Sequence, residues 1–196
     1  MSMYIVRSND ANTPFIEIEL DLEEAHTLEN ALSKIKILNH GTIPGPFVLE
    51  RCEFTGFTFS NCTLKNVMFK NCKFKNTVFV NCSMQGVKFR DCSMQGCRFI
   101  KNDMKRSFFI TAEVVRCLFQ DCNFKEAYLN QSFFNDVGFT NVDFDFSWWI
   151  KTRFSLVKCR RCYTPGVIAD ECKFDNILVD AYSADLQSII DQAINN

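Results

Sequence analysis

Cysteine is the residue type whose number and spacing in this sequence most strongly suggest chemistry. Eleven of the 196 residues are cysteine, whereas only two are histidine, His26 and His40. The sequence CRRC, from Cys159 to Cys162, matches half of a zinc or redox motif. A structural zinc site usually requires a second pair of ligands at a compatible spacing, and none follows. We therefore predict no metal site and no cofactor.

Other patterns that indicate catalysis are absent from the sequence. It contains no glycine-rich phosphate loop, no HExxH and no GxSxG. Acidic residues such as Asp143 and Asp145 are expected on an outer face with nothing to pair against. We predict a protein that is not an enzyme and has no catalytic residues.

The compartment is predicted from the first residues and from the free thiols. The start, MSMYIVRSNDANTPF, has no positive region followed by an apolar stretch, as a classical signal peptide would. No apolar run approaches the roughly 18 residues that span a bilayer. We expect no membrane span and a reducing, cytoplasmic environment; export as an effector without a cleaved signal is the alternative.

The cysteines follow a repeat of five residues. The sequence CSMQG occurs at Cys82–Gly86 and again at Cys92–Gly96, and residues 52–181 divide into 26 consecutive units without an insertion. Position 3 of the unit is large and apolar almost throughout, position 1 is mostly small, and position 5 is Asn, Gly or Asp in the first nine units. Side chains at positions 1 and 3 point to the same side of an extended segment, and position 5 suits a corner. The chain is predicted to wind into a solenoid with positions 1 and 3 inside.

Ten cysteines occupy position 1 of a unit, where a reduced thiol behaves as a small apolar group. They are Cys52, Cys62, Cys72, Cys82, Cys92, Cys97, Cys117, Cys122, Cys162 and Cys172. Cys159 alone occupies position 3. We predict buried, free thiols, because parallel Cβ directions in stacked coils disfavour disulfides.

The repeat resembles the pentapeptide repeat protein family, whose pattern is A(D/N)LXX. Cys, Val, Ser or Ala stands for the first residue of that pattern and Phe for its Leu, from Cys52 to about Asp180. The resemblance implies an all-β fold, a right-handed quadrilateral β-helix with four units per coil. Six and a half coils at about 4.8 Å each would make a rod of about 30 Å, in which residues 20 apart stack.

Both ends depart from the repeat. Residues 1–46 read as short strands plus a helix, a small α/β N-terminal cap; residues 47–181 form the β-helix; residues 182–196 read as a C-terminal helix. One face of that helix carries Leu186, Ile189, Ile190 and Ile194. The helix is predicted to cap the solenoid, or to make a homodimer contact as a C-terminal element does in some family members. Weaker position 3 residues between Trp149 and Ala169 predict distorted or narrower coils there.

One outer side is predicted to carry an apolar stripe. Position 2 of this side, in steps of 20 residues, is large and apolar except at Lys88: Met68, Phe108, Tyr128, Trp148 and Ile168. Exposed apolar patches mark interaction sites, so the stripe is predicted to bind a protein partner. The alternative is that the N-terminal segment or the final helix covers it.

The first half of the rod is predicted to be basic. Residues 50–110 contain eleven basic and four acidic residues. The basic surface includes Lys70, Lys88, Arg90, Arg98, Lys101, Lys105 and Arg106. Such a surface favours nucleic acid, an acidic protein or anionic lipid, but the charges are spread over all four sides, so we expect a general solvated surface and no nucleic-acid partner.

Two functions follow from these patterns. The first is a non-enzymatic scaffold that binds a protein through the outer faces of the β-helix. The second is interaction with a type II topoisomerase, DNA gyrase, of the quinolone-resistance and gyrase-protection type. The resemblance suggests the second because the best-known family members imitate the size and negative charge of duplex DNA; a basic half-rod is a poor imitation.

Overall fold

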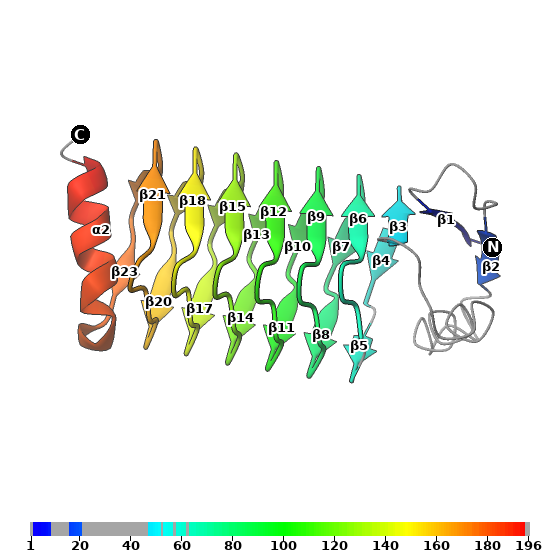
Figure 1. Cartoon of the computed structure of the whole chain (residues 1–196), viewed down its shortest axis with the longest axis horizontal. Coiled ribbons are helices and arrows are strands. Elements are labelled where there is room, and N and C mark those ends of the chain that lie inside the picture. The colour runs from blue at the N-terminus through cyan, green and yellow to red at the C-terminus, as the bar shows by residue number, and fades with distance from the viewer. Residues whose placement is uncertain are drawn as a thin grey trace.

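The protein is a rod of stacked coils with a helix across one end (Figure 1). The computed structural model describes residues 2–8, 16–20, 47–51, 53–56, 58–61 and 63–194. Each coil takes 20 residues, because paired strands are offset by 20, as in Phe69↔Phe89 and Phe89↔Phe109. Among the described residues, no helix combines the length and apolar composition that a membrane crossing requires.

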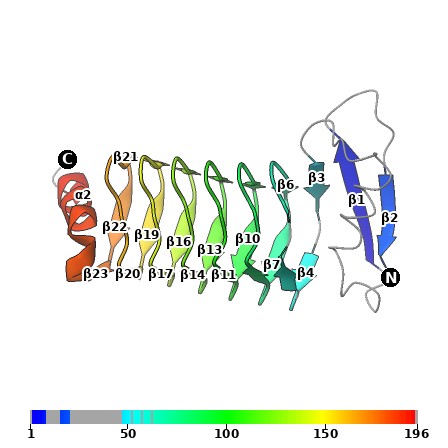
Figure 2. The ribbon, with the colours of Figure 1, turned by 60° about the horizontal axis from the view of Figure 1, so that its bottom comes forward.

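Three sides of the rod are sheets whose short strands pair in parallel from coil to coil, seen from two angles in Figures 1 and 2. Sheet 1 has the order β2 (Ile16–Leu20), β1 (Ser2–Ser8), β3 (Phe47–Glu50), β6 (Met68–Lys70), β9 (Lys88–Arg90), β12 (Phe108–Ile110), β15 (Tyr128–Asn130), β18 (Trp148–Ile150) and β21 (Ile168–Asp170). Sheet 2 consists of β4 (Glu53–Thr55), β7 (Lys73–Lys75), β10 (Ser93–Gln95), β13 (Glu113–Val115), β16 (Phe133–Asn135), β19 (Arg153–Ser155) and β22 (Lys173–Asp175). Sheet 3 consists of β5 (Thr58–Ser60), β8 (Val78–Val80), β11 (Arg98–Ile100), β14 (Leu118–Gln120), β17 (Gly138–Thr140), β20 (Lys158–Arg160) and β23 (Leu178–Val179).

The fourth side, called side 4, lacks continuous strands. Its coils are joined by isolated bridges that run from Thr63↔Ser83 to Asp143↔Tyr163. Each unit of side 4 ends in a turn, in which the backbone N–H of Val87, for example, donates to the carbonyl of Met84 at 3.1 Å. The fold is therefore the predicted four-sided β-helix, with three regular sides and one built from turns.

The core consists of position 3 side chains stacked in columns. Phe54, Phe74 and Met94 are all buried in one column, as the period of five predicts. The Phe59 and Phe79 rings lie parallel, with centroids 4.5 Å apart and 4° between their planes. A wholly apolar ring repeated every 20 residues fills the tube without leaving a buried polar group unpaired, which explains the high phenylalanine content.

The corners follow position 5 of every unit. From Arg51 to Asn176, each described position 5 residue has a positive φ, so the prediction that these residues turn the chain is confirmed. Gly86 lies against Asn66 in the preceding coil, where a Cβ would overlap the Asn66 Oδ1 atom. Glycine there satisfies both the left-handed backbone and the close approach.

The last coil is covered by a helix. Helix α2 (Ala184–Ile194) follows a single turn, η1 (Ala181–Ser183), and buries Leu186 and Ile190 against the core. Ile189 is half-buried, and the side chain of Ile194 lies outside the described residues. The helix thus lies across the end of the tube, and its predicted role as a cap or a dimer contact stays a prediction.

The other end of sheet 1 is extended by two antiparallel strands. β1 pairs with β3 in the register Ile5↔Glu50, and β2 pairs with β1. The helix predicted within residues 1–46 lies outside the described residues, as do His26 and His40. Of the distorted or narrower coils expected between Trp149 and Ala169, the distortion is not found, because the strands there keep the 20-residue register, as in Trp149↔Ala169.

Candidate functional site

The cysteines form part of the core. All nine described cysteines are buried, as predicted, and Cys52 and Cys62 lie outside the described residues. Each of the eight at position 1 donates its S–H to the carbonyl of a position 3 residue 23 residues earlier, at 3.1 to 3.7 Å. Burial raises the pKa of the Cys122 thiol to about 11, which keeps it protonated and unreactive.

The thiols avoid one of the four corners. After side 4, the position 3 carbonyl accepts the backbone N–H of the next position 1 residue. Position 1 there is Val67, Val87, Ser107, Ala127, Ser147 and Val167. At position 1, the described cysteines are therefore found only at the corners where the position 3 carbonyl of the preceding coil is free to accept their S–H. The thiols stabilise the coil, which is a structural role.

The two cysteines of the CRRC segment belong to the core. Cys159 and Cys162 both point into the tube and are buried. The neighbouring Cys162 thiol, together with burial, raises the pKa of Cys159. Within the described part of the chain, no three histidine, cysteine or acidic side chains come together as metal ligands would.

The predicted apolar stripe lies on the outside of sheet 1. The Phe108 and Tyr128 rings are parallel, 4.9 Å apart, and Tyr128 stacks on Trp148 at 6.1 Å. Met68 is half-buried at the other end of the column, and the Lys88 ammonium lies over the Phe108 ring at 5.4 Å from its centroid. Helix α2 does not cover this side, because it packs across the end of the tube against β21, β22 and β23.

Two aromatic residues beside this stripe were missed by sequence analysis. Phe146 occupies the corner between side 4 and sheet 1, and Tyr163 lies on side 4 one coil later. With Trp148 and Ile168 they form what we call the apolar patch, whose members Phe146, Trp148, Tyr163 and Ile168 are 62%, 40%, 55% and 45% exposed. The signal for Phe146 was present: the unit VDFDF places phenylalanine where most other units have a polar residue or glycine.

Phe146 is held against its neighbouring coil. Its ring lies on Gly166, where a Cβ would come within 2.5 Å of Phe146 Cδ1. Its backbone has φ 53°, a conformation that is unfavourable for a bulky residue. A large exposed ring at this corner therefore costs stability, which makes it a candidate for function.

The predicted basic residues lie on three different sides. Lys70, Lys88 and Arg90 are on sheet 1, Lys105 and Arg106 are on side 4, Arg98 is on sheet 3 and Lys101 is at the corner that follows it. Lys70 pairs with Glu50 at 3.3 Å and Arg90 with Asp91 at 3.5 Å. The seven residues therefore form no single patch.

A smaller basic set is brought together along the corner between side 4 and sheet 1. The corner groove, about 670 Å³, is lined by Lys65, Asn66, Gln85, Gly86, Lys88, Lys105, Arg106, Phe108, Glu126 and Tyr128. The turn residues of four successive coils form one wall, and the position 2 residues of sheet 1 form the other. In the next coil, Phe146 continues the wall of turn residues and Trp148 continues the wall of position 2 residues. The groove therefore leads into the apolar patch.

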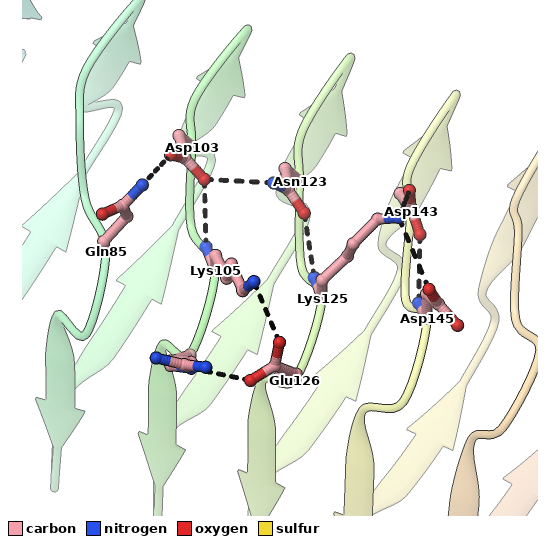
Figure 3. A network of polar contacts seen from close by, with 9 residues as sticks. Gln85, Asp103, Lys105, Asn123, Lys125, Glu126, Asp143 and Asp145 are labelled. Atoms are coloured by element: carbon pink, nitrogen blue, oxygen red, sulfur yellow. Dashed lines mark hydrogen bonds and ion pairs between the residues drawn. The ribbon is translucent and has the colours of Figure 1, made fainter.

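Glu126 is the acidic residue of the groove. Lys105 Nζ lies 2.9 Å from Glu126 Oε1, and Arg106 Nε donates to Oε2 at 2.6 Å (Figure 3). The hydrogen bond from Arg106 contributes most, and that from Lys105 next, to holding the pKa of Glu126 below its usual value. Glu126 thus remains ionised and offsets part of the positive charge of the groove.

A row of polar side chains stabilises side 4 beside the groove. Asp103 accepts the backbone N–H of Lys105 at 3.3 Å and the amide of Asn123 at 3.2 Å, and Gln85 donates to its other oxygen (Figure 3). At the end of this row, Lys125 Nζ lies 3.2 Å from Asp143 Oδ2 and 3.4 Å from Asp145 Oδ2. These acids are therefore occupied in hydrogen bonds and ion pairs, contrary to the expectation that Asp143 and Asp145 have nothing to pair against.

Comparison with known proteins identifies the coils. The family model described as "Pentapeptide repeat region" matches residues 48–115, and the family model described as "Pentapeptide repeats (8 copies)" matches residues 117–158. No curated protein matches the chain.

Solved structures of the same architecture are similar at low identity. A pentapeptide repeat protein from the thylakoid lumen of Arabidopsis thaliana is 22% identical, with a TM-score of 0.45. The alignment covers 47% of this chain and 64% of the Arabidopsis chain, so this protein spans less than two thirds of that relative's length. The pentapeptide repeat protein Rfr23 from the cyanobacterium Cyanothece 51142 is 10% identical with a TM-score of 0.34, covering 80% and 97%. The plasmid-mediated fluoroquinolone resistance protein QnrB1 is 12% identical with a TM-score of 0.25, covering 76% and 100%.

Proposed function

The chain belongs to the pentapeptide repeat family, and from this we propose that it is a non-enzymatic scaffold that binds a protein partner with the outer faces of its β-helix. The surface that we assign to this binding is the apolar patch of Phe146, Trp148, Tyr163 and Ile168, together with the stacked Phe108 and Tyr128 rings. The observation that carries the proposal is the exposure of the patch on the last two coils.

The arrangement of the core supports binding by the outside of the rod. Positions 1 and 3 fill the tube, and the cavity enclosed beneath α2 by residues such as Trp149 and Phe174 measures only about 10 Å³, room for roughly one water. This space is too small for a ligand larger than water, which favours binding on the outer surface. Aromatic side chains contribute most to protein interfaces, since each buries about 150–250 Å².

Removal of the patch tests the proposal. The double variant Phe146→Ser and Trp148→Ser should lose the proteins that the wild type captures from its native cell extract, as measured by quantitative mass spectrometry. The control is Leu178→Ser, which removes a 64% exposed apolar side chain from sheet 3, on the opposite side of the tube. Equal capture by all three proteins would count against the proposed surface.

Self-association is measured on the same variants. If the wild type is a dimer in analytical ultracentrifugation and the double variant is a monomer, the partner at the patch is a second copy of the chain. A dimer that is instead lost on mutation of Ile189, the half-buried apolar residue of α2, would place the contact on the helix.

Topoisomerase interaction is the alternative function. A protein that imitates DNA needs negative charge along the rod, whereas the corner groove carries Lys65, Lys88, Lys105 and Arg106. The decisive assay is supercoiling by DNA gyrase with micromolar protein, with and without a fluoroquinolone. Inhibition or protection would favour this alternative over the scaffold.

A further inference from the structure

The corner groove has an excess of positive charge that the described residues do not neutralise. Lys105 and Arg106 share Glu126. Lys65 and Lys88 make no ion pair with a described residue, and the Lys88 ammonium is positioned over the Phe108 ring. An anionic group entering the groove would therefore meet two uncompensated ammonium groups and two partly compensated cations.

The aromatic wall of the groove presents ring edges. The Phe108 and Tyr128 rings are parallel within 5° and 4.9 Å apart, so each covers a face of the other. Inserting a further ring would require about 7 Å between them, twice the van der Waals contact distance. The edges of aromatic rings carry partial positive charge, and such edges attract carboxylate and carbonyl oxygens rather than stacking with nucleic-acid bases.

The acids beside the groove limit the length of an anionic ligand. Asp103, Asp143 and Asp145 follow one another along side 4, and Glu126 projects into the groove itself. A phosphate backbone carries one charge per nucleotide and would pass these carboxylates over its whole length. A short acidic peptide can place its few charges on the lysines and its apolar residue elsewhere.

The groove and the apolar patch together specify one kind of partner. We propose that the partner is a protein segment in which acidic residues, bound over Lys65, Lys88, Lys105 and Arg106, adjoin a large apolar residue that packs on Tyr128, Phe146 and Trp148. This inference rests on the proposed scaffold function, which it deepens by naming the chemistry of the partner. The two parts of the surface meet at Phe108 and Tyr128, so one continuous segment reaches both.

Selection from a random 12-residue peptide display library, on the full chain, tests the inference. The selected peptides should be enriched in Asp and Glu next to a Leu, Phe or Trp, and their affinity should fall as salt is raised from 50 to 300 mM. Selection of neutral or basic peptides would overturn the inference. Tighter binding of a 12-nucleotide oligothymidylate than of any acidic peptide would also overturn it, in favour of single-stranded nucleic acid.

Charge variants locate the binding. The double variant Lys65→Glu and Lys88→Glu should weaken the selected peptides about tenfold, at about 0.7 kcal/mol for each reversed charge. Lys158→Glu, the same change on exposed sheet 3, should leave affinity unchanged. Glu126→Gln should strengthen binding about threefold, because it frees Lys105 and Arg106, and a gain cannot arise from misfolding. Unchanged affinity in both groove variants would place the peptides elsewhere and overturn the inference.

The two proposals fail separately. If the Phe146→Ser and Trp148→Ser variant loses its cellular partner while no acidic peptide binds, the scaffold function stands and the chemistry assigned to the partner is wrong. If acidic peptides bind the groove but no protein depends on the patch, the scaffold function at this surface is wrong.

Discussion

The same substitution, serine to alanine, should change stability in opposite directions at two buried corners. Ser132 and Ser147 both occupy position 1 and are 3% and 0% exposed. Ser132 Oγ accepts the backbone N–H of Ala112 at 3.0 Å and lies 3.1 Å from the carbonyl of Phe109, to which it donates. Ser147 Oγ has no hydrogen-bond partner among the described residues, since the carbonyl 23 residues earlier, that of Phe124, accepts the backbone N–H of Ala127 instead.

The expected magnitudes follow from these partners. Ser132→Ala removes a hydrogen bond worth about 1 kcal/mol and leaves the buried Ala112 N–H without an acceptor, for a total cost of about 2 kcal/mol. Ser147→Ala removes a hydroxyl that is buried without a partner, so it should stabilise by about 1 kcal/mol. Alanine fits this corner, because Ala127 occupies the equivalent place one coil earlier.

Urea unfolding followed by far-UV circular dichroism measures both changes. At an m-value of about 2 kcal/mol/M, the midpoint should fall by about 1 M in Ser132→Ala and rise by about 0.5 M in Ser147→Ala. Ser132→Thr is the control, since Thr152 in the same column makes the equivalent bond to Leu129 at 2.8 Å. Hydrogen exchange should quicken at the Ala112 amide only in Ser132→Ala. Equal destabilisation in both alanine variants would refute the reasoning that a position 1 hydroxyl is bonded at the corner of Ser132 and unbonded at the corner of Ser147.

Two further predictions concern titratable groups. Because burial raises the pKa of Cys122 to about 11, maleimide at pH 8 should modify it far more slowly in native than in urea-unfolded protein; rapid native labelling in peptide mass spectrometry would contradict its burial. The Ser183 hydroxyl lowers the pKa of Asp180, which also accepts the Arg161 N–H. The stabilisation of the α2 junction by Asp180 is therefore present above the unfolded-state pKa of about 4 and lost as pH falls through the folded-state value. The protection of the α2 amides against hydrogen exchange, corrected for the intrinsic exchange rate at each pH, should fall below about pH 4 in the wild type. Asp180→Ala should lack this acid-dependent loss of protection.

The period of five was sufficient to predict the fold because each position has one structural task. Position 3 residues such as Phe54 and Phe74 face inward, and position 5 residues such as Asn76 adopt positive φ, as the sequence pattern indicates. The expectation of distorted coils near Cys159 was wrong because the backbone ladders do not depend on the size of position 3. A smaller side chain changes the filling of the tube but leaves the hydrogen bonds between coils in place.

The interaction surface was less accessible to sequence reasoning because it spans two sides. The stripe was found by following position 2 along one side, whereas Phe146 is at position 5 and Tyr163 belongs to side 4. Arg106 and Glu126 are 20 residues apart, so their pairing follows from the coil length once the corner is known. Counting charges without this register overestimates the basic character of the rod.

The repeat provides an internal comparison that separates structural from functional residues. At the corner that Phe146 occupies, the preceding coils place Asn66, Gly86, Arg106 and Glu126, all with positive φ and no exposed ring. The fold therefore does not require an aromatic residue at this place, and a positive φ penalises one. Trp148, by contrast, continues a column that already holds Phe108 and Tyr128 after Lys88. Phe146 therefore exposes apolar surface at a corner where the fold does not require it, which is the internal observation that favours the proposed binding surface.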